Sequence, residues 1–394
     1  MTRQIPLVYV VACEPSGDEL GAKLIVALRA ETKGAIAFAG VGGRAMTEVG
    51  LTSLFDPSDL ALIGIFEVLP KAALVLRRVG ETVADIVSRQ PDILVTIDSW
   101  GFTGRVHQRL ARMRHPAARV RYVAPQVWAW RPGRARQLAR WIHHLMTLLP
   151  FEPPYFQAVG LPATWVGHPV IESGADRGDA ARFKAIHGIV PAATVLCILP
   201  GSRRSEVSRL LPVFGEVAEL VAAKISGLVV VVPTVPNVDE AVRNAVAGWA
   251  CRSIVVSDAS AKYDAFAAST VALAASGTVT LELALAGVPH VIGYRVNSLT
   301  AWIVKRALKT RFANLINVLL DRMVVRERLQ GECRADLLFG DVMQLLSEPS
   351  AREAMNGDFA AALSRLAPKD GAPSRVAARA VLSLIGVPHS PTPR

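Results

Sequence analysis

Short apolar runs alternate with segments of helical periodicity along most of this chain. Leu7 to Ala12 runs into the loop Glu14 to Asp18, and Ile93 to Ile97 ends at Asp98. The runs have the length of strands and are apolar at successive positions, which is typical of strands buried on both faces. Strands that alternate with helices predict a parallel sheet with right-handed crossovers. Such sheets bind ligands at the carboxyl ends of their strands, where Glu14, Asp18 and Asp98 are expected.

The same pattern restarts in the second half, with strands expected at Thr194 to Leu199 and Val271 to Ala275. A chain of 394 residues is long enough for two domains, and the charged segment Glu172 to Asp179 is expected to link them. We expect an N-terminal domain over residues 1–168 and a second domain over residues 169–355. Residues 356–394 should form helices that pack back on the first domain and end in a frayed tail.

The least charged window, Ala267 to Tyr294, is broken by Gly277, Gly287 and Pro289. It therefore predicts a strand, a helix and a strand instead of a transmembrane helix. The polar residues that follow the first apolar run argue against a signal peptide. The four cysteines are far apart and lack CxxC spacing, which argues against a zinc site and a disulfide framework. Reduced cytosolic thiols and no metal site are expected.

Lysine and arginine exceed aspartate and glutamate by 44 − 33 = 11, so the partners are expected to be anionic. Nucleic acid, phosphorylated substrates and an anionic membrane surface all fit. Ile63 to Arg78 reads either as a buried helix or as an exposed apolar wall for acyl chains or a membrane. Leu299 to Arg311 reads either as a packed helix or as a basic amphipathic helix on a membrane. The residues expected to meet lipid are Ile63, Ile65, Phe66, Val68, Leu69 and Trp302.

Two tryptophans and an arginine, Trp128, Trp130 and Arg131, follow an expected strand. They read as core aromatics beside a solvated basic helix face, or as a surface for single-stranded nucleic acid, although no recognition module accompanies them. Gly40 to Ala45 has the form G-x-G-x-x-A, but it follows the second strand and no strand ending in an acid appears downstream. We interpret it as a tight turn.

Two loops of the second half suit an anionic ligand. Ser276-Gly277-Thr278 lies between a strand and a helix, whose free amides favour phosphate, and Glu282 could accept hydrogen bonds from a ribose. An ordinary turn capped by threonine is the alternative. Pro200 to Glu206 offers two arginines, which suit bidentate phosphate contacts. The P-loop pattern is missing, so an ATPase is disfavoured.

In their joint order, the motifs resemble those of the lipid-A-disaccharide synthase family, which are GT-B glycosyltransferases. The resemblance rests on motifs along nearly the whole chain: Glu14 to Asp18, Val41 to Gly43 with Met46, Leu62 to Leu69, Ile97-Asp98, Pro125 to Arg131, Leu149 to Glu152, Val166 to Pro169, Leu199 to Val207, Ala275 to Glu282, Tyr294 to Val296 and Leu299-Thr300.

The resemblance implies an α/β fold of two Rossmann-like parallel-sheet domains facing across a cleft. It implies an inverting transfer of 2,3-diacylglucosamine from UDP to 2,3-diacylglucosamine 1-phosphate, giving the lipid A disaccharide 1-phosphate and UDP. No cofactor or metal is expected. The place of action would be the cytoplasmic face of the inner membrane of Gram-negative bacteria, and a homodimer is left open. The alternatives are another UDP-sugar GT-B enzyme, a UDP-GlcNAc epimerase, or a non-enzymatic membrane or nucleic-acid binder.

An inverting transfer needs a base for the acceptor hydroxyl and positive charge for the departing diphosphate. Asp98 is the expected base, with Glu14 as the second candidate; Arg203 and Arg204 would steady UDP, and Glu282 would hold its ribose. The full set expected to bind substrate is Ser16, Arg131, Gly201, Ser202, Arg203, Arg204, Glu206, Ser276, Gly277, Thr278, Thr280, Glu282, Tyr294 and Asn317.

The sequence departs from the family pattern after Asp98. Ser99-Trp100-Gly101 stands where most members have a proline and a second aspartate, so that second carboxylate cannot be essential here. Ile316, Met323 and Arg326 replace prolines common in the family. These changes bear on acceptor or acyl-length preference and leave the reaction itself unaffected.

Overall fold

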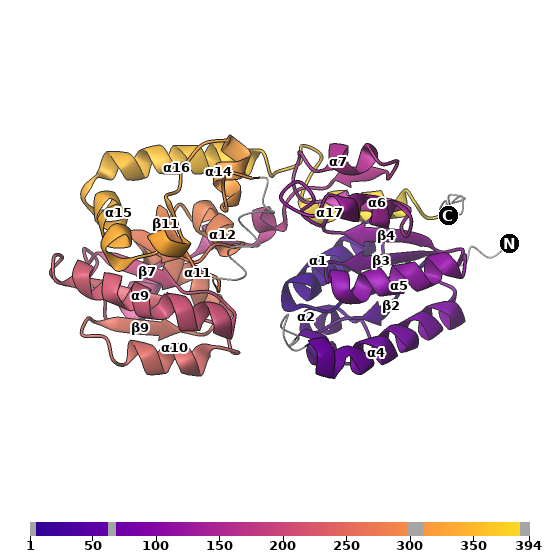
Figure 1. Cartoon of the computed structure of the whole chain (residues 1–394), viewed down its shortest axis with the longest axis horizontal. Helices are drawn as coiled ribbons and strands as arrows, with labels where there is room; N and C mark the ends of the chain where they lie inside the picture. Colours follow the sequence, from indigo (N-terminus) through magenta and orange to yellow (C-terminus); the bar gives the residue numbers. More distant parts are fainter. Residues whose placement is uncertain (1–4, 62–67, 298–309, 387–394) are drawn as a thin grey trace. The chain divides into compact units, whose positions relative to one another are not determined.

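The computed structural model describes residues 5–61, 68–297 and 310–386 (Figure 1). Contacts divide the chain into two compact units, Met1–Pro169 with Leu366–Arg394, and Val170–Arg365. Each unit is built on its own parallel sheet of six strands.

The first unit contains a sheet in the order β2-β1-β3-β4-β5-β6. Its strands are β1 (Leu7–Ala12), β2 (Ala37–Val41), β3 (Ile93–Ile97), β4 (Ala118–Tyr122), β5 (His144–Thr147) and β6 (Ala163–Trp165). Its helices are α1 (Pro15–Glu31), α2 (Arg44–Glu48), α3 (Ser58–Ala61), α4 (Val68–Arg89), α5 (Trp100–Arg112), α6 (Gly133–Ala139), α7 (Pro153–Gln157) and α17 (Pro373–Leu382).

Both faces of this sheet are covered, which explains why most positions of β1 and β3 are apolar. In β1, Val8 and Val10 pack in a core with residues of α1 and α17. Tyr9 and Val11, which alternate with them, pack in a second core with residues of α4 and α5. The sheet therefore lies between two helical layers, and its carboxyl edge is left to the loops.

The second unit repeats the architecture with the strand order β12-β11-β10-β7-β8-β9. Its strands are β7 (Val195–Leu199), β8 (Val229–Pro233), β9 (Ser253–Val256), β10 (Val271–Ala274), β11 (His290–Tyr294) and β12 (Glu327–Leu329). Its α-helices are α8 (Ala180–Ile186), α9 (Arg204–Ala222), α10 (Asp239–Val246), α11 (Ala259–Ala268), α12 (Val279–Leu285), α14 (Leu315–Leu320), α15 (Ala335–Ser347) and α16 (Pro349–Ser364). Short 3-10 helices lie at η1 (Pro169–Glu172), η2 (Ala175–Arg177) and η3 (Gln330–Glu332).

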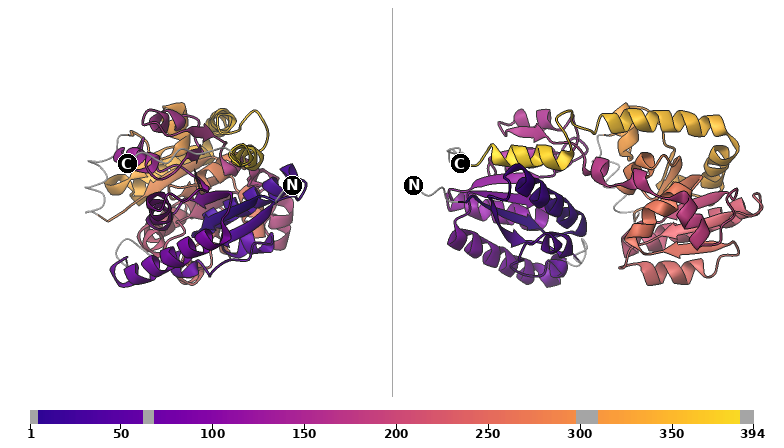
Figure 2. Two further views of the ribbon diagram at one scale, coloured as in Figure 1. Left: turned by 90° about the vertical axis from the view of Figure 1, so that its right-hand side faces the viewer. Right: turned by 180° about the vertical axis from the view of Figure 1, so that it is seen from behind.

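The final helices divide between the two units at a different residue from the one expected. Helix α16 remains in the second unit, where Phe359 is buried and its ring stacks on His290 of β11 at 5.1 Å. The chain returns to the first unit at Leu366, and α17 packs along α1, as Figure 2 shows. Arg375 and Arg379 of α17 both form ion pairs with Glu31 at the end of α1.

The least charged window forms the end of α11, then β10, α12 and β11, so the prediction of a strand, a helix and a strand is confirmed. Among the described helices, none combines the length and the apolar character that crossing a bilayer requires. Ile63, Ile65, Phe66 and Trp302 lie outside the described residues, as does the tail expected to fray. Val68 and Leu69 belong to the first turn of α4.

Candidate functional site

The two expected carboxylates of the first unit follow adjacent strands. Glu14 comes two residues after Ala12 of β1, and Asp98 comes one residue after Ile97 of β3. Ala12 and Ile97 are partners in the parallel register of these strands, so both acids leave the sheet at the same level of its carboxyl edge. Glu14 precedes α1, and the next residues Pro15 and Ser16 are exposed at the start of that helix.

A buried arginine lies beneath Asp98. Arg121 of β4 is only 1% exposed, and its Nη2 lies 3.5 Å from Oδ1 of Asp98, whose side chain is 49% exposed. The guanidinium also donates to Thr103 Oγ1 at 2.9 Å and to the carbonyl of Val123 at 3.0 Å. Burial lowers the pKa of Arg121 to about 10, so it stays charged at neutral pH. Arg121 thus holds one side of the Asp98 carboxylate while the other side remains open to solvent.

Left-handed backbone gathers at the same edge. Asp98 and Ser99 have φ angles of 47° and 50°, and Val123 and Arg131 have φ angles of 78° and 50°. Residues with a Cβ adopt this conformation at an energetic disadvantage, above all a β-branched residue such as valine. Such strained positions concentrate at functional sites, where surrounding contacts hold them. Here the holding contacts include the bond from Arg121 to Val123 and the bond from Thr103 Oγ1 to the Asp98 carbonyl at 2.7 Å.

Asp18 lies away from this site because its carboxylate stabilises α2. It accepts hydrogen bonds from the backbone amides of Gly43 at 2.7 Å, Ala45 at 2.8 Å and Met46 at 3.2 Å. The amides of Gly43 and Ala45 belong to the G-x-G-x-x-A segment, and a dinucleotide phosphate would need them. Because the Asp18 carboxylate already accepts from these amides, the structure is consistent with the interpretation of this segment as a turn.

The tryptophan-rich loop after β4 has a buried part and an exposed part. Trp128 is held by a hydrogen bond from its Nε1 to Glu152 at 3.2 Å and by an edge-on contact with Phe151. Burial raises the pKa of Glu152 to about 7. Trp130 instead stacks with Arg131 at 4.4 Å, and this arginine is exposed. The loop is therefore anchored through Trp128 and offers Arg131 to solvent.

In the second unit, the expected loops follow three neighbouring strands, β7, β10 and β11. Gly201, Ser202, Arg203 and Arg204 follow β7, and the last three of these are exposed. Glu206 is buried in the first turn of α9 and accepts from the amides of Ser202 and Arg203, each at 3.3 Å. It also accepts from the hydroxyl of Tyr294, at the end of β11, at 3.2 Å. Burial and the nearby Glu206 raise the pKa of Tyr294.

This arrangement changes what the loop after β7 can offer a ligand. The amides of Ser202 and Arg203, expected to be free, are occupied by Glu206. Arg203 Nη1 also lies 3.0 Å from that carboxylate, while its side chain stays 72% exposed. Glu206 therefore shapes the loop from beneath, and the exposed guanidiniums of Arg203 and Arg204 are the groups available to an anion.

The loop after β10 leaves Gly277 and Thr278 exposed at the start of α12. Among the described residues, no side chain caps this helix, so Thr278 does not have the capping role of the alternative interpretation. Thr280 is buried and donates its hydroxyl to the carbonyl of Gly277 at 2.8 Å, which shapes the loop. Glu282 accepts from Tyr263 at 2.9 Å and pairs with Lys262 at 2.6 Å.

Asn317 is placed in the core. It is fully buried, its Nδ2 donates to Val325 and Glu327, and its Oδ1 accepts from the amides of Val324 and Val325. These four bonds use the hydrogen-bonding capacity of its amide. Glu327 in turn accepts from the backbone amide of Asn314 at 2.9 Å, and the side-chain Nδ2 of Asn314 donates to Thr280 Oγ1 at 3.0 Å. Asn317 thus supports the loop after β10 from behind and has no free group for a substrate.

Sequence reasoning missed Arg121. The signal for it is the run Ala118-Arg119-Val120-Arg121-Tyr122, which places two arginines in a strand at the middle of a sheet buried on both faces. A buried charge in such a strand needs a partner of opposite charge. The carboxylate of Asp98, at the end of the neighbouring strand β3, is such a partner.

A sequence profile of the lipid-A-disaccharide synthetase family matches residues 8–367. The chain belongs to the lipid-A-disaccharide synthase family. A family relative from Rhodospirillum centenum, a lipid-A-disaccharide synthase, is 52% identical over 379 residues, which cover 96% of this chain and 94% of the relative. The expected glycosyltransferase class is confirmed by this membership.

Solved structures match at the level of the fold. A UDP-GlcNAc 2-epimerase from Neisseria meningitidis, bound to UDP-GlcNAc, has a TM-score of 0.64 at 12% identity, with 96% of this chain and 99% of that chain covered. A glycosyltransferase from Rickettsia africae has a TM-score of 0.59 at 9% identity, covering 97% and 99%. The predicted GT-B pairing of two Rossmann-like domains is confirmed. Because the epimerase likeness shows the fold alone, the family match decides against the epimerase alternative.

Proposed function

We propose that this enzyme transfers 2,3-diacylglucosamine from its UDP donor to 2,3-diacylglucosamine 1-phosphate, forming the lipid A disaccharide 1-phosphate and UDP. Membership of the lipid-A-disaccharide synthase family supports the reaction class, because a UDP-sugar and a lipid acceptor are the substrates that this family and fold imply. At the level of residues, the proposal is carried by Asp98. Its backbone is left-handed, its carboxylate contacts the buried Arg121 on one side, and the other side of the carboxylate is open to solvent.

Asp98 is the proposed general base. An inverting displacement requires a group that accepts the proton of the acceptor hydroxyl as its oxygen attacks the anomeric carbon. The bond between the anomeric carbon and the diphosphate breaks in the same step, and the electron pair leaves with UDP. Asp98 suits this role because Arg121 holds its carboxylate on the protein side and Thr103 holds its backbone carbonyl. Glu14, at the same level of the neighbouring strand, is the second candidate.

The leaving diphosphate is assigned to the second unit. Arg203 and Arg204 supply exposed positive charge after β7, and the backbone of Ser276-Gly277-Thr278 offers a close approach after β10. Guanidinium groups form bidentate hydrogen bonds with phosphate oxygens and stabilise the charge that develops on them. Glu282 is the proposed ribose contact, with Lys262 and Tyr263 holding its carboxylate. In this proposal the arginines take the place of a metal ion.

The enzyme is proposed to act at the cytoplasmic face of the inner membrane as a peripheral protein. The excess of positive charge, 44 − 33 = 11, favours an anionic surface. Leu76 of α4 is 48% exposed next to the exposed Arg77, which is the combination of apolar and basic groups that interfacial helices use.

Two isosteric substitutions test the assignment of the base. Asp98→Asn should lower kcat by roughly 10²–10⁴-fold because the amide cannot accept the proton. UDP affinity, measured by isothermal titration, should stay within about threefold because the proposed UDP contacts lie in the other unit. Glu14→Gln provides the comparison and should lower kcat less. Near-normal turnover of Asp98→Asn, with a large loss in Glu14→Gln, would move the role of base to Glu14.

A further inference from the structure

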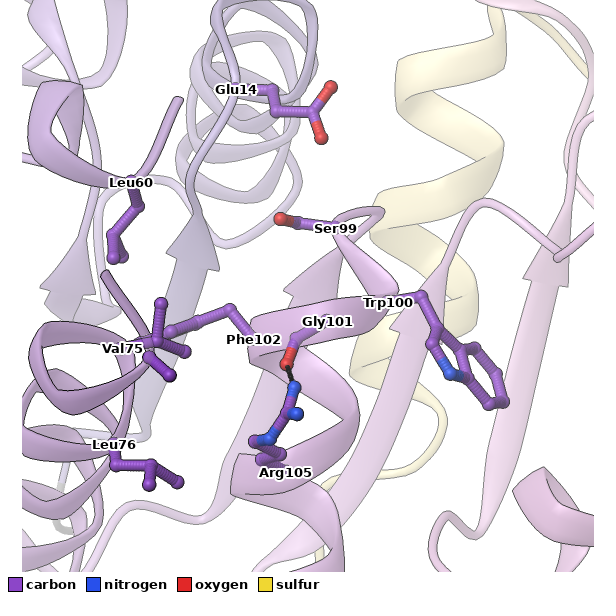
Figure 3. Close-up of a pocket in the computed structure, with 10 residues that line it drawn as sticks. Glu14, Leu60, Val75, Leu76, Ser99, Trp100, Gly101, Phe102 and Arg105 are labelled. Atoms are coloured by element: carbon purple, nitrogen blue, oxygen red, sulfur yellow. Dashed lines mark hydrogen bonds between the residues drawn. The ribbon is translucent and has the colours of Figure 1, made fainter. Parts of the chain in front are cut away.

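The first unit contains a cavity of about 300 Å³ between α4 and α5 that the proposed chemistry does not use (Figure 3). Val75 and Leu76 of α4 form one wall and Phe102 of α5 faces them, with Leu60 of α3 above. Its volume lies at the lower end of the range for small-molecule pockets. The cavity is therefore large enough for an apolar segment of a ligand.

One end of this cavity is polar, and its walls are apolar except at Arg105. Glu14 and Ser99 line the end near the carboxyl edge of the sheet, where Ser99 directly follows Asp98. Below them the lining is aliphatic and aromatic apart from Arg105, and Leu76 remains 48% exposed. Phe102 is fixed in the wall by burial and by an edge-on contact with Phe55 at 6.3 Å. A ligand with a polar head near Asp98 and a hydrocarbon chain matches this order of groups.

We propose that this cavity, the α4–α5 pocket, binds one acyl chain of the acceptor. The inference rests on the proposed function, because the acceptor hydroxyl must reach Asp98. Two residues that line the pocket lie near Asp98: Ser99 is the next residue in the chain, and Glu14 follows the adjacent strand β1 at the same edge of the sheet. The proposed diphosphate contacts belong to the second unit, so this proposal assigns the pocket of the first unit to the acceptor. Burial of the chain would cover Leu76 and the apolar walls, which favours binding in proportion to the area removed from water.

Gly101 controls the width of the pocket. It lines the cavity at the second position of α5, and among the described residues beyond its own helix backbone a Cβ built there would approach Nη1 of Arg105 at 3.9 Å and nothing closer. Arg105 also lines the cavity and bonds the Gly101 carbonyl, as Figure 3 shows. A larger side chain at Gly101 therefore fits the backbone and takes up space that the acyl chain would occupy.

The test compares acceptors that differ only in acyl length. Wild type and Gly101→Leu are assayed with a tetradecanoyl and a butanoyl acceptor at a fixed donor, and the ratio of the two kcat/KM values is measured. Each methylene kept out of the pocket should lower kcat/KM by about fourfold. The long-to-short ratio of Gly101→Leu should thus fall at least about tenfold below that of wild type. Val75→Ala, which widens the opposite wall, should shift the preference toward longer chains.

Gly357→Leu is the matched control, because Gly357 is an exposed helical glycine of α16 with open space around its Cβ position. It should keep the wild-type ratio. An unchanged ratio in both Gly101→Leu and Val75→Ala would overturn the pocket. A shift in ratio with donor acyl length at a fixed acceptor would instead assign the pocket to the donor chain. If wild type forms no disaccharide with any acceptor, the proposed function itself fails, which is a separate outcome.

Discussion

Replacing Arg121 by methionine should separate catalysis from stability. Burial lowers the pKa of Arg121 from 12.5 to about 10, so keeping this charge in the folded protein costs about 3 kcal/mol, and methionine relieves that cost. The substitution also leaves Thr103 Oγ1 and the Val123 carbonyl without their donor, at about 1–3 kcal/mol each. The two effects partly cancel, and we expect the free energy of unfolding to fall by no more than about 3 kcal/mol.

Catalysis should respond much more strongly. Without Arg121 the Asp98 carboxylate loses the group that fixes it, and misplacement of a catalytic group by about 1 Å can lower the rate by about 10²-fold. We therefore expect kcat to fall by about that factor, while the KM for the donor changes little. Steady-state kinetics and urea denaturation of the same preparations measure both quantities.

Arg119 provides the control. It lies two residues earlier on β4, is buried, and has a pKa lowered to about 10 by burial. Its bonds go to the carbonyls of His115 and Trp141 and to the ring of His143, and the structure shows no carboxylate partner for it among the described residues. Arg119→Met should therefore lose stability without the selective loss of kcat. Equal losses of kcat in the two variants would refute the assignment of Arg121 as the positioning residue.

Two further predictions concern stability. Burial lowers the pKa of His290 and of His168 to about 4, so between about pH 4 and 6.5 the unfolded chain binds more protons, and the free energy of unfolding should decrease as pH falls through this window. His290→Leu should lower the slope, measured by urea denaturation, by about 1.4 kcal/mol per pH unit within this window, which is the contribution of one proton. An unchanged slope would contradict the burial of a neutral His290. Asn317→Ala should lower the free energy of unfolding by about 3 kcal/mol, because it leaves the amides of Val324 and Val325 without an acceptor. The exposed Asn244→Ala is its control, and equal effects in the two variants would contradict the network.

The sheets followed from the sequence because their strands are buried on both faces. The limits of β1 and β3 are those expected, since continuous apolar runs between polar loops leave little choice of register. The order of the motifs also placed Glu14 and Asp98 at one edge of one sheet. These features depend on local patterns, and local patterns can be read along the chain.

The parts that could not be predicted depend on contacts between distant residues. The role of Asp18 depends on amides 25 to 28 residues away, and the role of Asn317 depends on β12 and the turn before it. The contact between Arg121 and Asp98 forms only because β4 pairs with β3 in the folded sheet. The end of the second unit was misplaced because Phe359 of α16 packs on His290 of β11, a contact that has no signature in the sequence of α16.

The most direct test of the proposed reaction is incubation of the purified enzyme with UDP-2,3-diacylglucosamine and 2,3-diacylglucosamine 1-phosphate, followed by mass spectrometry. The proposal predicts the disaccharide 1-phosphate and UDP in equal amounts, with neither formed when one lipid is omitted. Release of UDP without a disaccharide, or an epimerised sugar nucleotide in the absence of acceptor, would contradict it.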